Sequence, residues 1–174
     1  MKDSNFYWQK AFEFTIGSEG GLVDNRNDPG GLTKYGICKR DYPNEDIKNL
    51  TIERAKEIYY KNYWLPSNSQ QLIDLGFPLM SLCLFDCAIN CGCKTSKILL
   101  QKAIGVEADG LIGKKTIEVI KLYKDLELVE KYSDERLKYY DLISLKNKKL
   151  EIFKNGWRNR VAHLKKYVFD LNKK

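Results

Sequence analysis

The chain of 174 residues is 43% hydrophobic, 12% aromatic and 30% charged, which is typical of a folded globular protein and excludes an acidic disordered chain. Basic residues outnumber acidic ones by 30 to 23, but unevenly: residues 1–87 hold 10 basic and 12 acidic side chains, and residues 88–174 hold 20 and 11. This asymmetry favours a polyanionic partner, such as a nucleic acid, an anionic membrane surface or a cell-envelope polymer.

No stretch approaches the run of about 18 apolar residues that a transmembrane helix needs, so we expect no membrane span. The first residues lead into an amphipathic pattern rather than an apolar core, so we expect synthesis in the cytoplasm without a signal peptide. Four of the five cysteines crowd into residues 83–93, and in a reducing compartment we expect them to be thiols.

Apolar residues at helical spacing predict a first helix over about 5–18, which Gly17 and the next glycines end. Residues 20–50 are rich in Gly and Pro, and such a long irregular stretch is usually functional or contains a short hairpin. Only residues 32–38 show the alternation of apolar and polar residues that is typical of a β-strand. Thr51 is expected to cap the next helix. After a polar link at 67–71, helical patterns cover residues 79–89, 95–104, 116–123, 126–145 and 153–169.

The order of these elements predicts a mainly α protein, a helical bundle with a functional loop or short hairpin after the first helix. No internal repeat or low-complexity tract interrupts the chain.

Glu19 is the first candidate for chemistry, because it follows the first helix and precedes Gly20 and Gly21. The partial negative charge at a helix C-terminus, together with burial, disfavours an ionised carboxylate and raises its pKa. A raised pKa suits a general acid that protonates a leaving group. The alternative is an exposed glutamate beside a glycine-capped helix end.

Asp28 and Thr33 lie nine and fourteen residues beyond Glu19. An acid, a second carboxylate and a hydroxyl that orients water form a set suited to glycosidic hydrolysis. The sequence Asp28-Pro29-Gly30 is also typical of a turn, and a tight turn can itself fix a carboxylate.

The stretches 18–21 and 27–37 resemble the signature of glycoside hydrolase family 108, lysozyme-like N-acetylmuramidases that include phage endolysins and proteins once labelled secretion activators. The resemblance implies a lysozyme-like bundle, Glu19 as general acid, and roles for Asp28 and Thr33 in assisting it. Thr33 is one residue closer to Asp28 than in phage-type lysozymes. The similarity continues in order through residues 55–64, 85–92, 100–106, 109–116 and 156–161.

The same resemblance predicts a catalytic region over residues 1–92 and a peptidoglycan-binding-like helical region over residues 93–174, packed into one globule. In the second region, the glycines at 105, 110 and 113 fit the peptidoglycan-binding pattern, and an ordinary role as turn residues explains them equally well.

The family segments also suggest substrate contacts. Asp86 and Asn90 fall in a segment that the family places beside the cleft, although Asp86 could instead form a salt bridge and Asn90 a helix C-cap. Tyr35 and Trp64 are candidates for stacking on sugar rings, although aromatic residues at helical spacing are more often part of the core.

A metal site is disfavoured. Cys83, Cys87 and Cys91 recur at helical spacing with Cys93 close behind, but zinc ligands usually come as two separate pairs. The sequence has one histidine, His163. We therefore expect core packing for these cysteines and no cofactor.

The leading hypothesis is a monomeric lysozyme that cleaves the β-1,4 bond between N-acetylmuramic acid and N-acetylglucosamine in peptidoglycan. It would reach the wall through a holin or a secretion machinery. The alternative is a non-catalytic peptidoglycan-binding or secretion-accessory protein, and nucleic-acid binding ranks third because no recognition motif is present.

Overall fold

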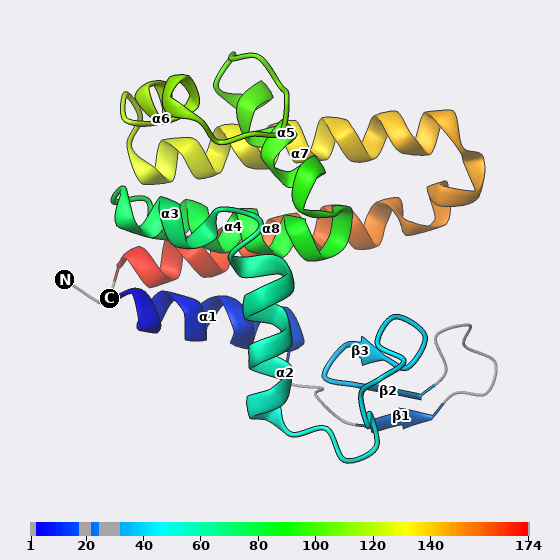
Figure 1. Ribbon diagram of the computed structural model, residues 1–174. Helices are drawn as coiled ribbons and strands as arrows, with labels where there is room; N and C mark the ends of the chain where they lie inside the picture. Colours follow the sequence, from blue (N-terminus) through cyan, green and yellow to red (C-terminus); the bar gives the residue numbers. More distant parts are fainter. Residues whose placement is uncertain (1–2, 18–21, 25–31, 174) are drawn as a thin grey trace.

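The computed structural model describes residues 3–17, 22–24 and 32–173. Within these ranges the protein is mainly α, with eight α-helices and one three-stranded antiparallel sheet (Figure 1). This confirms the predicted fold class. No helix in the described ranges is both long and apolar enough to cross a membrane.

The N-terminal elements form a helix followed by a small sheet. Helix α1 (Ser4–Ile16) begins where the Asp3 carboxylate accepts a hydrogen bond from the Phe6 backbone N–H at 2.8 Å. Strands β1 (Leu22–Asp24), β2 (Leu32–Lys34) and β3 (Ile37–Cys38) then form the sheet in the order β1-β2-β3. The predicted strand segment is confirmed, and β1 was not predicted.

Helix α2 (Ile52–Tyr59) begins at the predicted cap, because the Thr51 hydroxyl accepts a hydrogen bond from the Arg54 N–H at 3.1 Å. A π-helical turn, η1 (Tyr60–Trp64), continues it. Helix α3 (Ser69–Asp74) overlaps the segment predicted to be a polar link, and that prediction is wrong. Ser69 and Leu72 are buried, so packing stabilises a helix that the polar sequence did not indicate.

The remaining helices follow the sequence prediction with small shifts at their ends. They are α4 (Pro78–Cys91), α5 (Cys93–Ala103), α6 (Lys114–Ile120), α7 (Asp125–Lys146) and α8 (Lys154–Asn172), with a 3₁₀ turn, η2 (Lys148–Phe153), between the last two.

Helix α4 lies at the centre of the bundle, in contact with α1, α3, α5, α7 and α8 (Figure 1). Ten consecutive residues of α4, 79–88, are buried, which explains why apolar residues surround this helix rather than forming one stripe. One hydrophobic cluster includes residues from α1 through α8, so the N-terminal and C-terminal halves share a core. The sheet lies at one side of this bundle, beside the lower part of α2 (Figure 1).

Candidate active site

Helix α1 leads directly into the region that carries the predicted catalytic residues. It ends at Gly17, whose φ of 62° terminates the helix while its N–H still donates to the Glu13 carbonyl at 3.2 Å. Glu19 and Asp28 lie outside the described residues. Along the chain, Glu19 falls in the α1–β1 connection and Asp28 in the β1–β2 connection, so their proposed roles stay predictions.

Thr33 occupies the middle of the sheet. Its Cα is paired with Val23 of β1 on one side and with Cys38 of β3 on the other, and the residue is half-buried. The sheet therefore fixes the backbone of the third predicted catalytic residue from both sides. Its strand continues directly into the turn that contains Tyr35.

Tyr35 and Gly36 form the two-residue turn between β2 and β3. Both have positive φ, 52° and 75°, as a hairpin turn that matches the strand twist requires. The Tyr59 hydroxyl of α2 donates to the Tyr35 carbonyl at 3.1 Å, and burial raises the pKa of Tyr59 to about 12. A Cβ on Gly36 would lie 2.6 Å from that hydroxyl oxygen, so α2 approaches the turn too closely for a side chain. Tyr35 as a residue is half-buried, so part of it is accessible to solvent.

Trp64 does not present a surface to a sugar. It is fully buried, its ring centroid lies 5.1 Å from that of Trp8 and 5.3 Å from that of Phe85, and its indole N–H donates to the Gln70 side-chain oxygen at 3.2 Å. The predicted stacking contact is therefore corrected: Trp64 is part of an aromatic core between α1, η1 and α4.

Asp86 is likewise unavailable to substrate, because it is buried in an ion cluster. One carboxylate oxygen accepts from Arg136 of α7 at 2.7 Å, and the other accepts from Arg160 of α8 at 2.6 Å and 2.9 Å. Only 1% of Asp86 is exposed. The salt-bridge alternative is correct, and Asp86 joins the central helix to both long C-terminal helices.

Asn90 lies one turn after Asp86 and is exposed. Its side-chain amide donates to the Asp86 carbonyl at 2.7 Å, and Gly92, with φ of 90°, occupies the C-cap instead. Asn90 therefore remains available as a substrate contact, and the C-cap alternative is wrong.

Four of the five cysteines line α4 and the start of α5, and Cys38 lies in β3; all five are free thiols. Cys83 and Cys87 are buried, as expected for core packing, and Cys91 and Cys93 are half-buried. Hydrogen bonds from Cys87 and from the Tyr140 hydroxyl, which lies 3.4 Å away, lower the pKa of Cys91. Among the described residues, no group of three or more His, Cys, Asp or Glu side chains is arranged to hold a metal ion.

The glycine-rich loop after α5 is organised by one buried side chain, Gln101. Its amide nitrogen donates to an Asp109 carboxylate oxygen at 2.7 Å and to the Leu111 carbonyl at 2.9 Å, while its oxygen accepts from the Gly110 N–H at 2.7 Å. These polar groups satisfy one another, so the Asp-Gly pair serves as a structural turn here. Asp109 and Gln101 also line a hollow together with Lys114 and Lys115.

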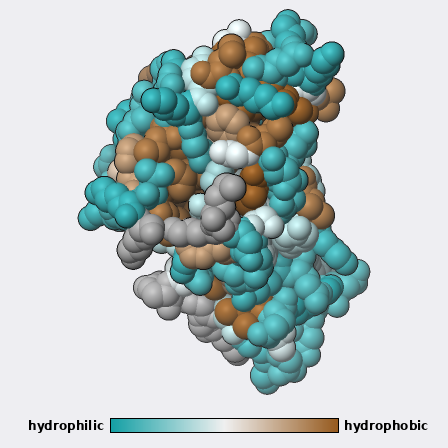
Figure 2. All heavy atoms as spheres, turned by 90° about the vertical axis from the view of Figure 1, so that its left-hand side faces the viewer, coloured by the Kyte–Doolittle hydropathy of each residue, from teal (hydrophilic) through white to brown (hydrophobic). Residues whose placement is uncertain are grey.

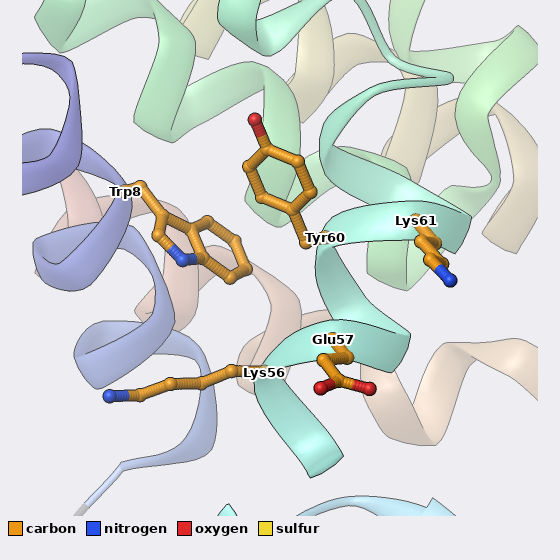
Figure 3. A pocket seen from close by; sticks show the side chains of 5 residues that line it. All are labelled: Trp8, Lys56, Glu57, Tyr60 and Lys61. Carbon is orange, nitrogen blue, oxygen red and sulfur yellow. The ribbon is translucent and has the colours of Figure 1, made fainter. Parts of the chain in front are cut away.

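A separate hollow lies between α1 and α2 (Figure 3). The rings of Trp8 and Tyr60, 5.2 Å apart between centroids, form its apolar floor, and Lys56, Glu57 and Lys61 surround it. None of the predicted site residues lines this hollow. It is therefore distinct from the hairpin that carries Thr33 and Tyr35.

Several functional contacts were missed by sequence reasoning. Arg136 was not singled out, although it occurs among the apolar residues of the buried α7 face, a signal that it needs a buried counter-charge. Tyr59, whose hydroxyl donates to the carbonyl of Tyr35 in the β2–β3 turn, was not singled out either.

Comparison with known proteins identifies two segments. Residues 12–92 match the family described as Glycosyl hydrolase 108, and residues 95–162 match the one described as Predicted Peptidoglycan domain. The first segment is thus similar to glycosyl hydrolase 108 proteins, and the second is similar to a predicted peptidoglycan domain. The first segment contains Glu19, Asp28, Thr33 and the α4 residues, and the second contains Gln101 and Arg136.

A solved structure is similar to this chain over nearly its whole length. The structure titled "Structure of Brucella abortus SagA" has a TM-score of 0.73 and 28% sequence identity, covering 95% of this chain and 95% of that one. The similarity therefore includes both segments rather than one of them. No curated protein matches the chain.

Proposed function

We propose that the protein is a peptidoglycan hydrolase, an N-acetylmuramidase that cleaves the β-1,4 bond between N-acetylmuramic acid and N-acetylglucosamine. The observation that carries the proposal is the glycosyl hydrolase 108 match over residues 12–92, which includes all three predicted catalytic positions. The adjoining predicted peptidoglycan domain supports the same polymer as substrate.

In this proposal Glu19 protonates the leaving glycosidic oxygen, because its place after a helix C-terminus favours the protonated acid. Asp28 activates a water molecule or stabilises the positive charge that develops on the sugar, and the Thr33 hydroxyl orients that water. The sheet supports these roles, because β1 and β2 adjoin the connections that contain Glu19 and Asp28, while β2 itself carries Thr33.

Tyr35 and Asn90 are the proposed substrate contacts. The Tyr35 ring is half-exposed beside Lys34, whose ammonium lies 5.5 Å from the ring centroid, and both follow Thr33 directly. Asn90 is exposed near the end of α4, where its carbonyl oxygen can accept from a sugar hydroxyl or amide.

Digestion of purified insoluble peptidoglycan by the full chain tests this function. Released fragments are reduced with borohydride and identified by mass spectrometry. We expect reduced N-acetylmuramic acid at the new ends. Reduced N-acetylglucosamine ends, or new free amino groups, would assign the chain to a different hydrolase class. The anomer released first, observed by NMR, distinguishes inversion from retention.

The predicted peptidoglycan domain favours a second candidate, a non-catalytic protein that binds the wall. It would bind purified sacculi without releasing any reducing ends. Either function requires a route to the wall, for which a holin or a secretion machinery is the proposed partner.

A further inference from the structure

The connection between the two long C-terminal helices exposes large apolar side chains. Helices α7 and α8 lie side by side, and the turn that joins them is at the end of the molecule away from both termini (Figure 1). We call residues 142–154 the basic tip. Leu145 is 79% exposed and Ile152 is 78% exposed, while Phe153 is 50% and Leu142 is 46% exposed. Four exposed apolar side chains in so short a segment indicate an interaction surface.

The same segment is strongly basic. Residues 142–154 include four lysines and one acidic residue, Glu151. Lys146, Lys148 and Lys149 are exposed and form no ion pair within the described part of the chain, whereas Lys154 pairs with Asp141 at 3.0 Å. The tip therefore presents uncompensated positive charge beside apolar surface.

Contacts at the base of the basic tip give it a defined structure. The Trp157 ring stacks on Tyr140 of α7 at 4.8 Å between centroids, and Phe153 lies against Trp157 at 5.9 Å. The Asn147 side chain caps η2 by accepting from the Lys149 N–H at 3.1 Å. The tip is thus a defined structure that holds Leu145 and Ile152 in solvent.

We propose that the basic tip attaches the protein peripherally to an anionic phospholipid surface. Its apolar side chains would enter the boundary between headgroups and acyl chains, while the lysines contact lipid phosphates. This binding goes beyond the glycan chemistry, because it requires neither Glu19 nor a sugar polymer.

The chemistry of the tip favours a bilayer over the other surfaces a basic patch could meet. A glycan strand offers anionic groups but no apolar phase to receive branched aliphatic side chains such as Leu145 and Ile152. A second copy of the chain would place two positively charged tips against each other, which is unfavourable. An anionic membrane satisfies both the charge and the apolar surface.

Co-sedimentation of the full chain with vesicles tests the proposal. We expect binding to vesicles of phosphatidylglycerol, weaker binding at high salt, and little binding to vesicles of phosphatidylcholine, which are neutral overall. The triple variant Lys146→Gln/Lys148→Gln/Lys149→Gln should lose affinity on the order of a hundredfold, because each lysine near an anionic surface contributes roughly a fivefold effect.

The other end of α7, about 33 Å away, supplies matched controls. That end, near α6, lies on the side that faces the viewer in Figure 2, where apolar patches also alternate with hydrophilic ones. The variant Lys121→Gln/Lys124→Gln/Lys131→Gln removes the same charge there. We expect it to retain binding within about threefold, because charges this far from the bound surface are largely screened by salt.

A second pair of variants separates apolar insertion from charge. Leu145→Ser/Ile152→Ser should weaken binding by at least about tenfold, since two large side chains leave the apolar phase. Leu111→Ser/Leu122→Ser, whose side chains are 67% and 80% exposed, should not. Circular dichroism melts confirm that each variant is folded.

Three outcomes would overturn the proposal. The first is equal loss in the tip and control variants, which would indicate a diffuse charge effect. The second is a wild-type chain that does not bind vesicles but does bind purified sacculi, with the tip variants losing the binding to sacculi. The third is a dimer in sedimentation velocity that the tip variants dissociate. None of these outcomes depends on hydrolysis, so failure here is distinguishable from failure of the proposed function.

Discussion

The two matched segments use their polar side chains differently. In residues 12–92, the described candidates Thr33 and Tyr35 lie half-exposed on a small sheet beside the bundle. In residues 95–162, Gln101 and Arg136 are buried and bonded to other protein groups. Thr33 and Tyr35 of the first segment are therefore partly exposed, whereas Gln101 and Arg136 of the second segment are structural, as is Asp86 of the first.

We expect the largest loss of stability from a substitution of Asp86, because this residue of the first segment neutralises two arginines of the second. Asp86→Asn leaves Arg136 without its buried counter-charge, and we expect a loss of about 3–5 kcal/mol in unfolding free energy. Urea denaturation followed by circular dichroism measures the loss.

Asp141→Asn is the matched control for that loss. Asp141 also accepts from two cations, Lys154 and Arg158, but its side chain is 37% exposed. Solvent screening should limit the effect to about 1 kcal/mol or less. Equal losses of unfolding free energy in Asp86→Asn and Asp141→Asn would show that the buried ion cluster of Asp86 contributes no more to stability than an exposed one.

Gly36 tests whether the hairpin of the first segment is held as tightly as the structure indicates. Gly36→Ala places a side chain at a position with φ of 75°, against the Tyr59 hydroxyl. We therefore expect the free energy of unfolding, measured by urea denaturation, to fall by about 2 kcal/mol. Gly156→Ala in α8 meets no atom within 4 Å and should be neutral or stabilising by up to about 1 kcal/mol. A neutral Gly36→Ala would contradict the close approach of α2.

Asp125 provides a test that depends on pH. Its carboxylate accepts from the backbone N–H groups of Leu79 and Met80 at 2.7 Å and 2.9 Å, so α7 caps the start of α4. Burial nevertheless raises the pKa of Asp125 to about 6. Between the unfolded and folded pKa values, the folded protein binds more protons than the unfolded chain, so this contribution to stability is present below pH 4 and is lost as the pH rises to 6.

The comparison of wild type with Asp125→Asn isolates this group from other titrating carboxyls. The stability of the wild type relative to the variant should fall by about 2 kcal/mol between pH 4 and pH 6, after allowance for partial exposure. Thermal melts across this range measure the difference. A relative stability that rises with pH would mean that the two backbone hydrogen bonds outweigh burial.

Helix positions could be predicted from the sequence because apolar periodicity and capping residues act locally. Thr51 is an example, since its hydroxyl bonds only three residues away. Helix α3 was missed because its helix depends on the burial of Ser69 and Leu72 against other elements. Strand β1 was missed because three residues are too few to show alternation.

The candidate site was likewise predicted only as far as local sequence allows, because contacts between distant elements leave no local pattern. Its motif predicted catalytic roles for Glu19, Asp28 and Thr33 from residues that are close in sequence. The side chains of Trp64 and Asp86 could not be assigned, because residue type does not reveal exposure. The partners of Asp86, Arg136 and Arg160, are 50 and 74 residues away, which no local pattern records.

The catalytic role of Glu19 is the central claim and has a direct measurement. Wild type, Glu19→Gln and Asp86→Asn are incubated with purified insoluble peptidoglycan, and the rate at which reducing ends appear is measured. Glu19→Gln should keep the wild-type melting temperature and lose at least about a thousandfold in rate, since the variant cannot protonate the leaving oxygen. Asp86→Asn should lose activity only in proportion to its unfolded fraction. A Glu19→Gln protein that releases reducing ends at the wild-type rate would contradict the account.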